Sequence, residues 1–149
     1  MSHFALEYSF NAKLHLNDMK THSQATIDTK RLSPASLKTF IKICEAWEVS
    51  IPEQLVLLGE PARTTFFKWK RDIANVQLSV DTLERISHLL GIYKSLQILL
   101  PDPKAADAWV KKPNEAPIFG GKSALDRMLA GRVSDLFVVH QYLDSVRGG

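Results

Sequence analysis

The chain has 149 residues, of which 45% are hydrophobic and 23% charged, so it is long enough for one domain, or two small ones, with a substantial core. This composition excludes disorder throughout the chain, and the lack of any run of about 18 apolar residues excludes a membrane-spanning helix. The net charge of +3 and the pI near 9.0 permit nucleic-acid binding but are too mild to require it.

Residues 1–32 carry little helical pattern, and we interpret them as an N-terminal arm. Their apolar side chains alternate over residues 4–10, as in a short strand, and the remainder is polar. The arm could be disordered, pack on the body or pair with a second subunit, and its sequence does not distinguish these. The first residues lack the basic region and long apolar core of a secretory signal, so we expect a cytoplasmic protein.

Ser33 and Pro34 supply a cap and a first-turn proline, which predicts a helix beginning there. Apolar residues at helical spacing extend it to about Val49. Cys44 lies among apolar residues of this helix and is the chain's single cysteine, so it has no internal disulfide partner. We interpret it as a small buried hydrophobe rather than a nucleophile.

The next stretch is typical of a helix-turn-helix. Ser50 and Glu53 form a capping box that starts a short helix. Gly59 stands where a left-handed residue ends a helix, and Pro61 suits the first turn of the following one. Two short helices are therefore predicted to meet at a tight turn.

The second of these helices has two contrasting faces, because side chains advance by about 100° per residue. Hydroxyls and cations occupy the exposed side, and such a surface suits phosphate oxygens and base edges in the major groove of DNA. A solvated cationic face on an ordinary bundle helix is the alternative. The predicted buried face consists of Ala62, Phe66, Trp69 and Ile73, and the candidate DNA-binding residues are Arg63, Thr64, Thr65, Lys68 and Arg71.

A fourth amphipathic helix is predicted from Val80 to Leu90, with Gly91 ending it. The four helices together match the architecture of small repressor-like DNA-binding domains. The apolar segment 92–100 is either a hinge or a second core helix, and Pro101 ends it.

The C-terminal part contains a short helix that includes Trp109 and ends within residues 107–112, a loop rich in turn-forming residues, and a last pair of helices. Ser123 and Asp126 form a second capping box, whose helix Gly131 ends. Ser134 is predicted to cap the final helix. Its apolar stripe consists of Leu136, Val139, Leu143 and Val146.

This part of the chain resembles the toxin-binding domain of the Xre, MbcA and ParS antitoxins, the antitoxin halves of bacterial RES–Xre toxin–antitoxin modules. The four preceding helices resemble that family's Xre-like helix-turn-helix domain, so the likeness spans about residues 33–149. Ala124 departs from the pattern, since many relatives carry proline there. The residues that carry the resemblance are Trp109, Pro113, Asn114, residues 119–126, Met128, Leu129, Gly131, Val138, Val139 and Leu143.

The resemblance implies an all-α protein with a helix-turn-helix Xre-like domain at residues 33–100 and a toxin-binding domain at 101–149. It implies an antitoxin that neutralises an NAD-degrading RES toxin and represses its own operon as a homodimer on operator DNA, within a larger toxin–antitoxin complex. We expect no enzyme activity, cofactor or metal, because no single motif holds a catalytic set or metal-ligand cluster.

We expect the toxin to dock on the last helix, whose apolar surface is wider than one stripe. The tail after that helix carries a cation and a terminal carboxylate, which could reach into the toxin's NAD pocket. The candidate toxin-binding residues are Phe137, Tyr142, Val146, Arg147, Gly148 and Gly149. Two rivals remain open: a free-standing helix-turn-helix transcriptional regulator without a toxin partner, and an adaptor that binds only protein.

Overall fold

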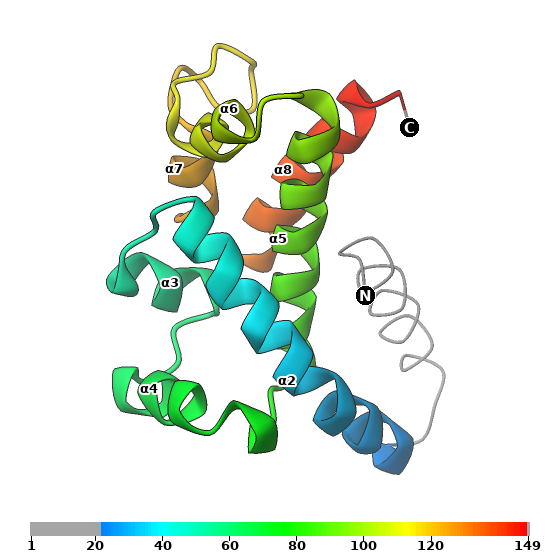
Figure 1. The fold of residues 1–149 in the computed structure, drawn as a ribbon. Helices are drawn as coiled ribbons and strands as arrows, with labels where there is room; N and C mark the ends of the chain where they lie inside the picture. Colours follow the sequence, from blue (N-terminus) through cyan, green and yellow to red (C-terminus); the bar gives the residue numbers. More distant parts are fainter. Residues whose placement is uncertain (1–21, 149) are drawn as a thin grey trace.

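The computed structural model describes the backbone of residues 22–148 and the side chains of residues 28–148, and within this range the fold is all-α, as predicted (Figure 1). The helices are α2 (His22–Ala46), α3 (Ile51–Leu57), α4 (Arg63–Arg71), α5 (Val80–Leu99), α6 (Pro103–Ala108), α7 (Ala124–Met128) and α8 (Val133–Val146), with 3-10 turns η1 (Ile73–Asn75) and η2 (Trp109–Lys111). The only β-type pairing among the described residues is an isolated bridge between Pro113 and Ser123.

Helix α5 is the centre of the molecule: α2 packs on one side of it and α8 on another (Figure 1). Its buried side chains, among them Leu83, Leu90 and Leu96, belong to one apolar core that extends from α2 to α8. Cys44 lies in the same core, as the sequence indicated. Burial of such a surface supplies the main driving force for folding.

The prediction that a helix ends at Gly91 is wrong, because α5 continues through it to Leu99. Gly91 is buried and faces α8, where a Cβ on it would lie 2.2 Å from Nε2 of His140. The missing side chain therefore lets two helices approach closely instead of ending one. Residues 92–99 are the second half of a core helix and not a hinge.

The predicted helix start at Ser33 is also wrong, since α2 begins eleven positions earlier, at His22, and contains Pro34 in its interior. The Ser33 hydroxyl donates to the carbonyl of Thr29 and accepts the Leu78 amide at 2.8 Å, so it joins α2 to the segment before α5. Residues 22–32 of the predicted arm are thus helical. Residues 1–21, with the proposed short strand, and Gly149 lie outside the described residues.

Local capping chemistry was predicted correctly at α3 and α7. Ser50 and Glu53 form the capping box of α3, and Ser123 and Asp126 form that of α7. Gly59 and Gly131 adopt positive φ, at 88° and 99°. These signals depend on only four or five consecutive residues, which explains why they could be identified from sequence.

Other helix boundaries differ from the prediction by a few residues. Helix α4 has Ala62 as its exposed N-cap, so Pro61 precedes the helix, and Ile73 lies in η1 beyond its end. Helix α8 begins one residue before Ser134; the carboxylate of Asp135 accepts the Arg132 amide at 3.0 Å and takes the capping role. The short helix predicted to end within residues 107–112 is α6, which ends at Ala108, and Trp109 lies in the following 3-10 turn η2.

Candidate functional site

Helices α3 and α4 form the predicted helix-turn-helix at one end of the molecule (Figure 1). The turn between them contains two residues with positive φ, Gly59 at 88° and Glu60 at 64°. A Cβ on Gly59 would lie 2.9 Å from Nε of Arg85, so the turn packs directly against a side chain of α5. The position of α4 is therefore set by the core helix and not by the turn alone.

One face of α4 anchors it to the core. Phe66 is fully buried and meets Phe40 of α2 edge to face, with ring centroids 6.5 Å apart. Trp69 is half-buried beside it. Ala62, predicted for this face, is exposed at the helix start. Aromatic packing of this kind fixes the orientation of a short helix that has little intrinsic stability.

The opposite face of α4 is polar and cationic. Thr64, Lys68 and Arg71 are exposed and lie within about 60° of one another around the helix axis. Thr65 is half-buried on one flank, nearer to the core than predicted. On the other flank, the exposed Arg63 stacks over the ring of Phe67 at 5.2 Å.

A further cation, Lys70, was not among the predicted site residues. Its Nζ lies 5.3 Å from the Phe66 ring centroid and 5.6 Å from that of Phe67. The two phenylalanines thus hold Lys70 and Arg63 along one flank of α4. Two aromatic residues with cations three or four positions away on the same helix are the sequence signal for such stacking.

The cations of α4 are available to an anionic partner. Among the residues that the structure describes, Arg63, Lys68 and Arg71 form no ion pair. The nearby carboxylate of Asp72 accepts hydrogen bonds from Asn75 at 3.1 and 3.2 Å. The face therefore has the charge and the donors that phosphate oxygens require.

The C-terminal half is held together by an arginine–carboxylate pair. Arg127 of α7 donates to Asp135 of α8 at 3.1 Å and to the carbonyl of Ile118 at 3.0 Å. Asp135 is buried, and its second oxygen accepts the Arg132 amide. Sequence reasoning missed this pair, whose signal would have been two opposite charges flanking the Gly131 turn.

Aromatic residues join the loop before α7 to α8. Phe119 meets Trp109 edge to face at 6.0 Å and Tyr142 of α8 at 5.3 Å. Two of these residues, Trp109 and Phe119, belong to the motif that carries the family resemblance. Their role in the structure is to fix the loop over residues 111–122 against the last helices.

The predicted toxin-binding side chains of α8 do not form one patch. Phe137 and Val146 are 48% and 52% exposed, but nine positions separate them, which places them about 180° apart around the helix. Phe137 lies on the flank that faces α5, where it meets His88. Tyr142 lies on the other flank and is half-buried against Phe119.

The tail begins from an anchored position and not from a free tether. Arg147 donates to the buried hydroxyl of Ser95 on α5 at 3.2 Å and lies 3.8 Å from Asp144. Gly148 is exposed with φ 88°. Because the Arg147 guanidinium is held by α5, the direction in which the chain leaves α8 is set by the protein core.

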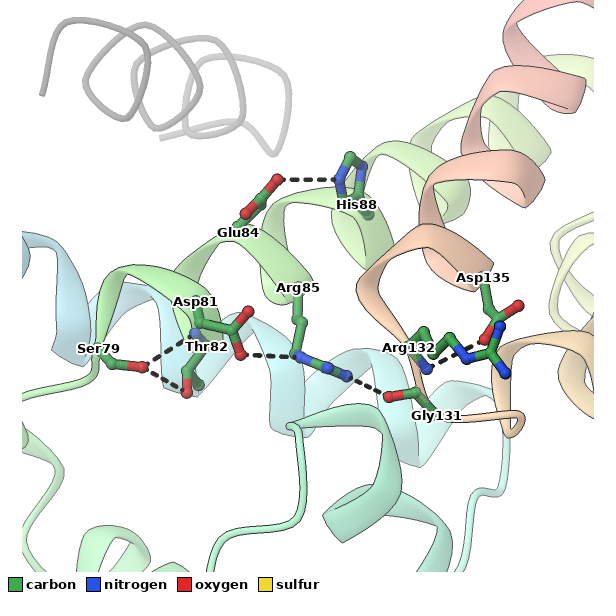
Figure 2. A network of polar contacts seen from close by, with 9 residues as sticks. All are labelled: Ser79, Asp81, Thr82, Glu84, Arg85, His88, Gly131, Arg132 and Asp135. Carbon is green, nitrogen blue, oxygen red and sulfur yellow. Dashed lines mark hydrogen bonds and ion pairs between the residues drawn. The ribbon is translucent and has the colours of Figure 1, made fainter. Parts of the chain in front are cut away.

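Arg85 connects the two halves (Figure 2). Its guanidinium donates to Asp81 at 3.1 Å and to the carbonyl of Gly131, in the α7–α8 turn, at 3.0 Å. The same side chain packs under Gly59. One buried arginine on α5 therefore contacts the helix-turn-helix and the C-terminal pair at once.

Within residues 28–148 no group of three or more histidine, cysteine or acidic side chains could hold a metal ion. Burial raises the pKa of the Cys44 thiol far above its usual range, which disfavours the reactive thiolate. No described helix is long and apolar enough to cross a membrane.

Comparison with known proteins identifies the C-terminal region. Residues 95–149 match the antitoxin Xre/MbcA/ParS C-terminal toxin-binding domain, a segment that begins in the second half of α5. The chain is similar to the uncharacterized protein y4oB of Sinorhizobium fredii (strain NBRC 101917 / NGR234), with 48% identity over 127 residues that cover 85% of this chain and 95% of that protein. The chain therefore belongs to the Xre/MbcA/ParS-type antitoxins, a family of toxin-binding proteins.

Proposed function

We propose that this antitoxin neutralises an NAD-degrading RES toxin and represses its own operon by binding operator DNA. In this proposal residues 33–100 form the DNA-binding domain and residues 101–149 the toxin-binding domain. It acts in the cytoplasm, without catalysis of its own and without a cofactor. The observation that carries the proposal is the toxin-binding domain over residues 95–149, joined to a chain whose α4 exposes a cationic face.

The DNA-binding part rests on α4. Lys68, Arg71 and Arg63 would contact phosphates or base edges, with Thr64 and Thr65 beside them. Lys70 would add a phosphate contact from the flank that the phenylalanines define. One chain presents one such helix, so we expect a homodimer on a pseudo-palindromic site.

The toxin-binding part rests on α8 and the tail. Its two flanks offer different contacts: Phe137 on the α5 side, and Tyr142 with Val146 on the loop side. We propose that the toxin engages at least one of these flanks while the segment after α8, residues 147–149, reaches into the toxin's NAD pocket. Ser95 and Asp144, which hold Arg147, would orient that tail.

The experiment is co-expression with the neighbouring open reading frame, scored by growth rescue and co-purification. We expect the full chain to restore growth and to co-purify with the RES toxin. A free-standing regulator would instead show a DNA footprint with no toxin next door, and a protein-only adaptor would show no sequence-specific footprint. The first pattern would refute toxin neutralisation, and the second would refute operator binding.

Deletion of residues 147–149 tests the tail separately. We expect the truncated chain to retain operator binding but to release NAD consumption by the toxin. The matched control is Lys112→Ala, an exposed cation in the loop before α7 and outside the family motif, which should leave both activities intact. If the truncated chain still silences the toxin, the tail does not enter the toxin's active site.

A further inference from the structure

Helices α5 and α8 run parallel and share a polar seam. Two contacts recur at the same offset along the chain, His88 with His140 and Ser95 with Arg147, as parallel helices require. Both histidine side chains are largely buried in this seam, at 15% and 18% exposure. A pocket of about 440 Å³ opens beside them, lined also by Phe137 and Asp144.

The two histidines face each other directly. Nδ1 of His88 lies 3.1 Å from Nδ1 of His140, which is hydrogen-bond distance, and the ring planes are inclined at 71°. Their outer nitrogens face carboxylates: Nε2 of His88 lies 3.9 Å from Glu84, and Nε2 of His140 lies 3.6 Å from Asp144. The close approach depends on Gly91, which leaves the space that the His140 ring occupies.

This arrangement fixes how many protons the pair can hold. With one added proton, three ring N–H groups serve the pair: one bridges the two Nδ1 atoms, and the other two point at the carboxylates. With a second proton, both Nδ1 atoms carry hydrogen, and two cationic donors oppose each other at 3.1 Å. The doubly protonated pair therefore cannot keep this contact.

The surrounding charges do not relieve that conflict. From α5, Glu84 faces His88, while the guanidinium of Arg85 turns away to Asp81 and Gly131 (Figure 2). From α8, Asp144 faces His140, but its carboxylate also contacts Arg147. Among the residues whose side chains the structure describes, the only ring neighbour outside the pair is Phe137, edge to face with His88 at 5.8 Å, which brings no charge.

Both the burial and the neighbouring His140 lower the pKa of His88 to about 4, from 6.5 for a free imidazole. The folded state thus binds this proton less readily than the unfolded chain, so the contribution of the seam to stability is complete above about pH 6.5 and is lost as the pH falls through 4. With a His88 pKa of 6.5 in the unfolded chain and about 4 in the folded protein, the unfolding equilibrium constant rises roughly 20-fold between pH 7 and pH 5.

The geometry points to a proton-operated closure: the His88–His140 pair holds α8 on α5 while it carries at most one proton, and a second proton opens the seam. The part that opens includes the middle of α8, next to Phe137. If this antitoxin binds its toxin through α8, as proposed above, acidification weakens the complex. The closure itself is a property of the antitoxin alone.

The first test uses the free full-length protein. Urea unfolding from pH 7 to pH 5 should show the roughly 20-fold rise for the unaltered chain. In His140→Gln the amide oxygen can accept from a protonated His88 and the neighbouring imidazole is gone, so the rise should be smaller than in the unaltered chain, with the part due to burial of His88 remaining. His3→Gln, which removes a histidine outside the pair, should retain the full rise. An unchanged rise in His140→Gln would overturn the closure.

A second measurement avoids dependence on the folding of variants. In the unaltered protein the imidazole NMR signals of His88 should titrate with a midpoint near 4. A midpoint of 6 or above would overturn the closure. Toxin affinity measured over the same pH range tests whether acidification weakens the complex. If the seam opens but the affinity does not fall, the toxin does not use this part of α8.

Discussion

Replacement of Gly91 by alanine adds one carbon atom where α5 and α8 meet, and so tests how closely the two helices approach each other. The added Cβ would lie 2.2 Å from Nε2, 2.4 Å from Cε1 and 2.8 Å from Cδ2 of His140. Ordinary carbon contacts are about 3.5 to 4 Å, so the imidazole must leave its position or the helices must separate. Gly91→Ala therefore disrupts the seam without removing any existing contact atom.

The expected magnitude combines opposing effects. Alanine is favoured over glycine in a helix interior by about 1 kcal/mol. Overpacking of a closely packed site costs about 1 to 3 kcal/mol, and loss of the His88–His140 hydrogen bond costs about 1 kcal/mol more. We expect a net loss of about 1 to 3 kcal/mol in the free energy of unfolding.

The assay is urea unfolding at pH 7, with the double variant Gly91→Ala/His140→Ala as its partner. Removal of the imidazole restores the space, so the alanine at 91 should be neutral or stabilising in the His140→Ala background. This change of sign between the two backgrounds is the result that identifies the contact. Stabilisation of about 1 kcal/mol by Gly91→Ala alone, as at an open helix surface, would refute the close approach of α8.

Two further substitutions test α2 and α4. Ser33→Ala leaves the buried Leu78 amide without its acceptor and should lower the free energy of unfolding by about 1 to 3 kcal/mol in chemical denaturation. Ser134→Ala, on the exposed first turn of α8, should change it by less than about 0.5 kcal/mol, and equal losses would refute the bridging role of Ser33. Lys68→Ala with Arg71→Ala should weaken operator binding and reduce its salt slope by roughly one unit per lost phosphate contact in a gel-shift titration, and an unchanged affinity would contradict the assignment of α4.

Features that depend on a few consecutive residues were predictable from the sequence. The capping boxes at Ser50 and Ser123 and the left-handed glycines at 59 and 131 are local, and the structure shows each of them. Periodicity likewise identified the exposed cationic face of α4. Such signals need no knowledge of what lies across the core.

The errors arose where a distant part of the chain decides the role of a residue. Gly91 follows an apolar helical pattern, as a glycine that ends a helix would, but the ring of His140, 49 positions later, fills the space beside it. Ser33 precedes a proline, as a cap would, yet its hydroxyl serves the Leu78 amide. Tertiary contacts of this kind override local propensity.

The candidate toxin surface shows the same limit. An apolar periodicity could identify α8 as a helix with a wide apolar surface, but not that Phe137 faces α5 while Tyr142 packs on Phe119. The anchoring of Arg147 by Ser95 joins residues 52 positions apart, which no spacing rule would suggest. The C-terminal site therefore needed the structure for its geometry and the family comparison for its role.

We propose that this chain holds a RES toxin inactive through its C-terminal region. The most direct measurement is NAD consumption by the purified toxin from the neighbouring gene, titrated with the full-length antitoxin. We expect that consumption falls to zero at a fixed molar ratio and returns when residues 147–149 are deleted. Undiminished NAD consumption at saturating full-length antitoxin would contradict it.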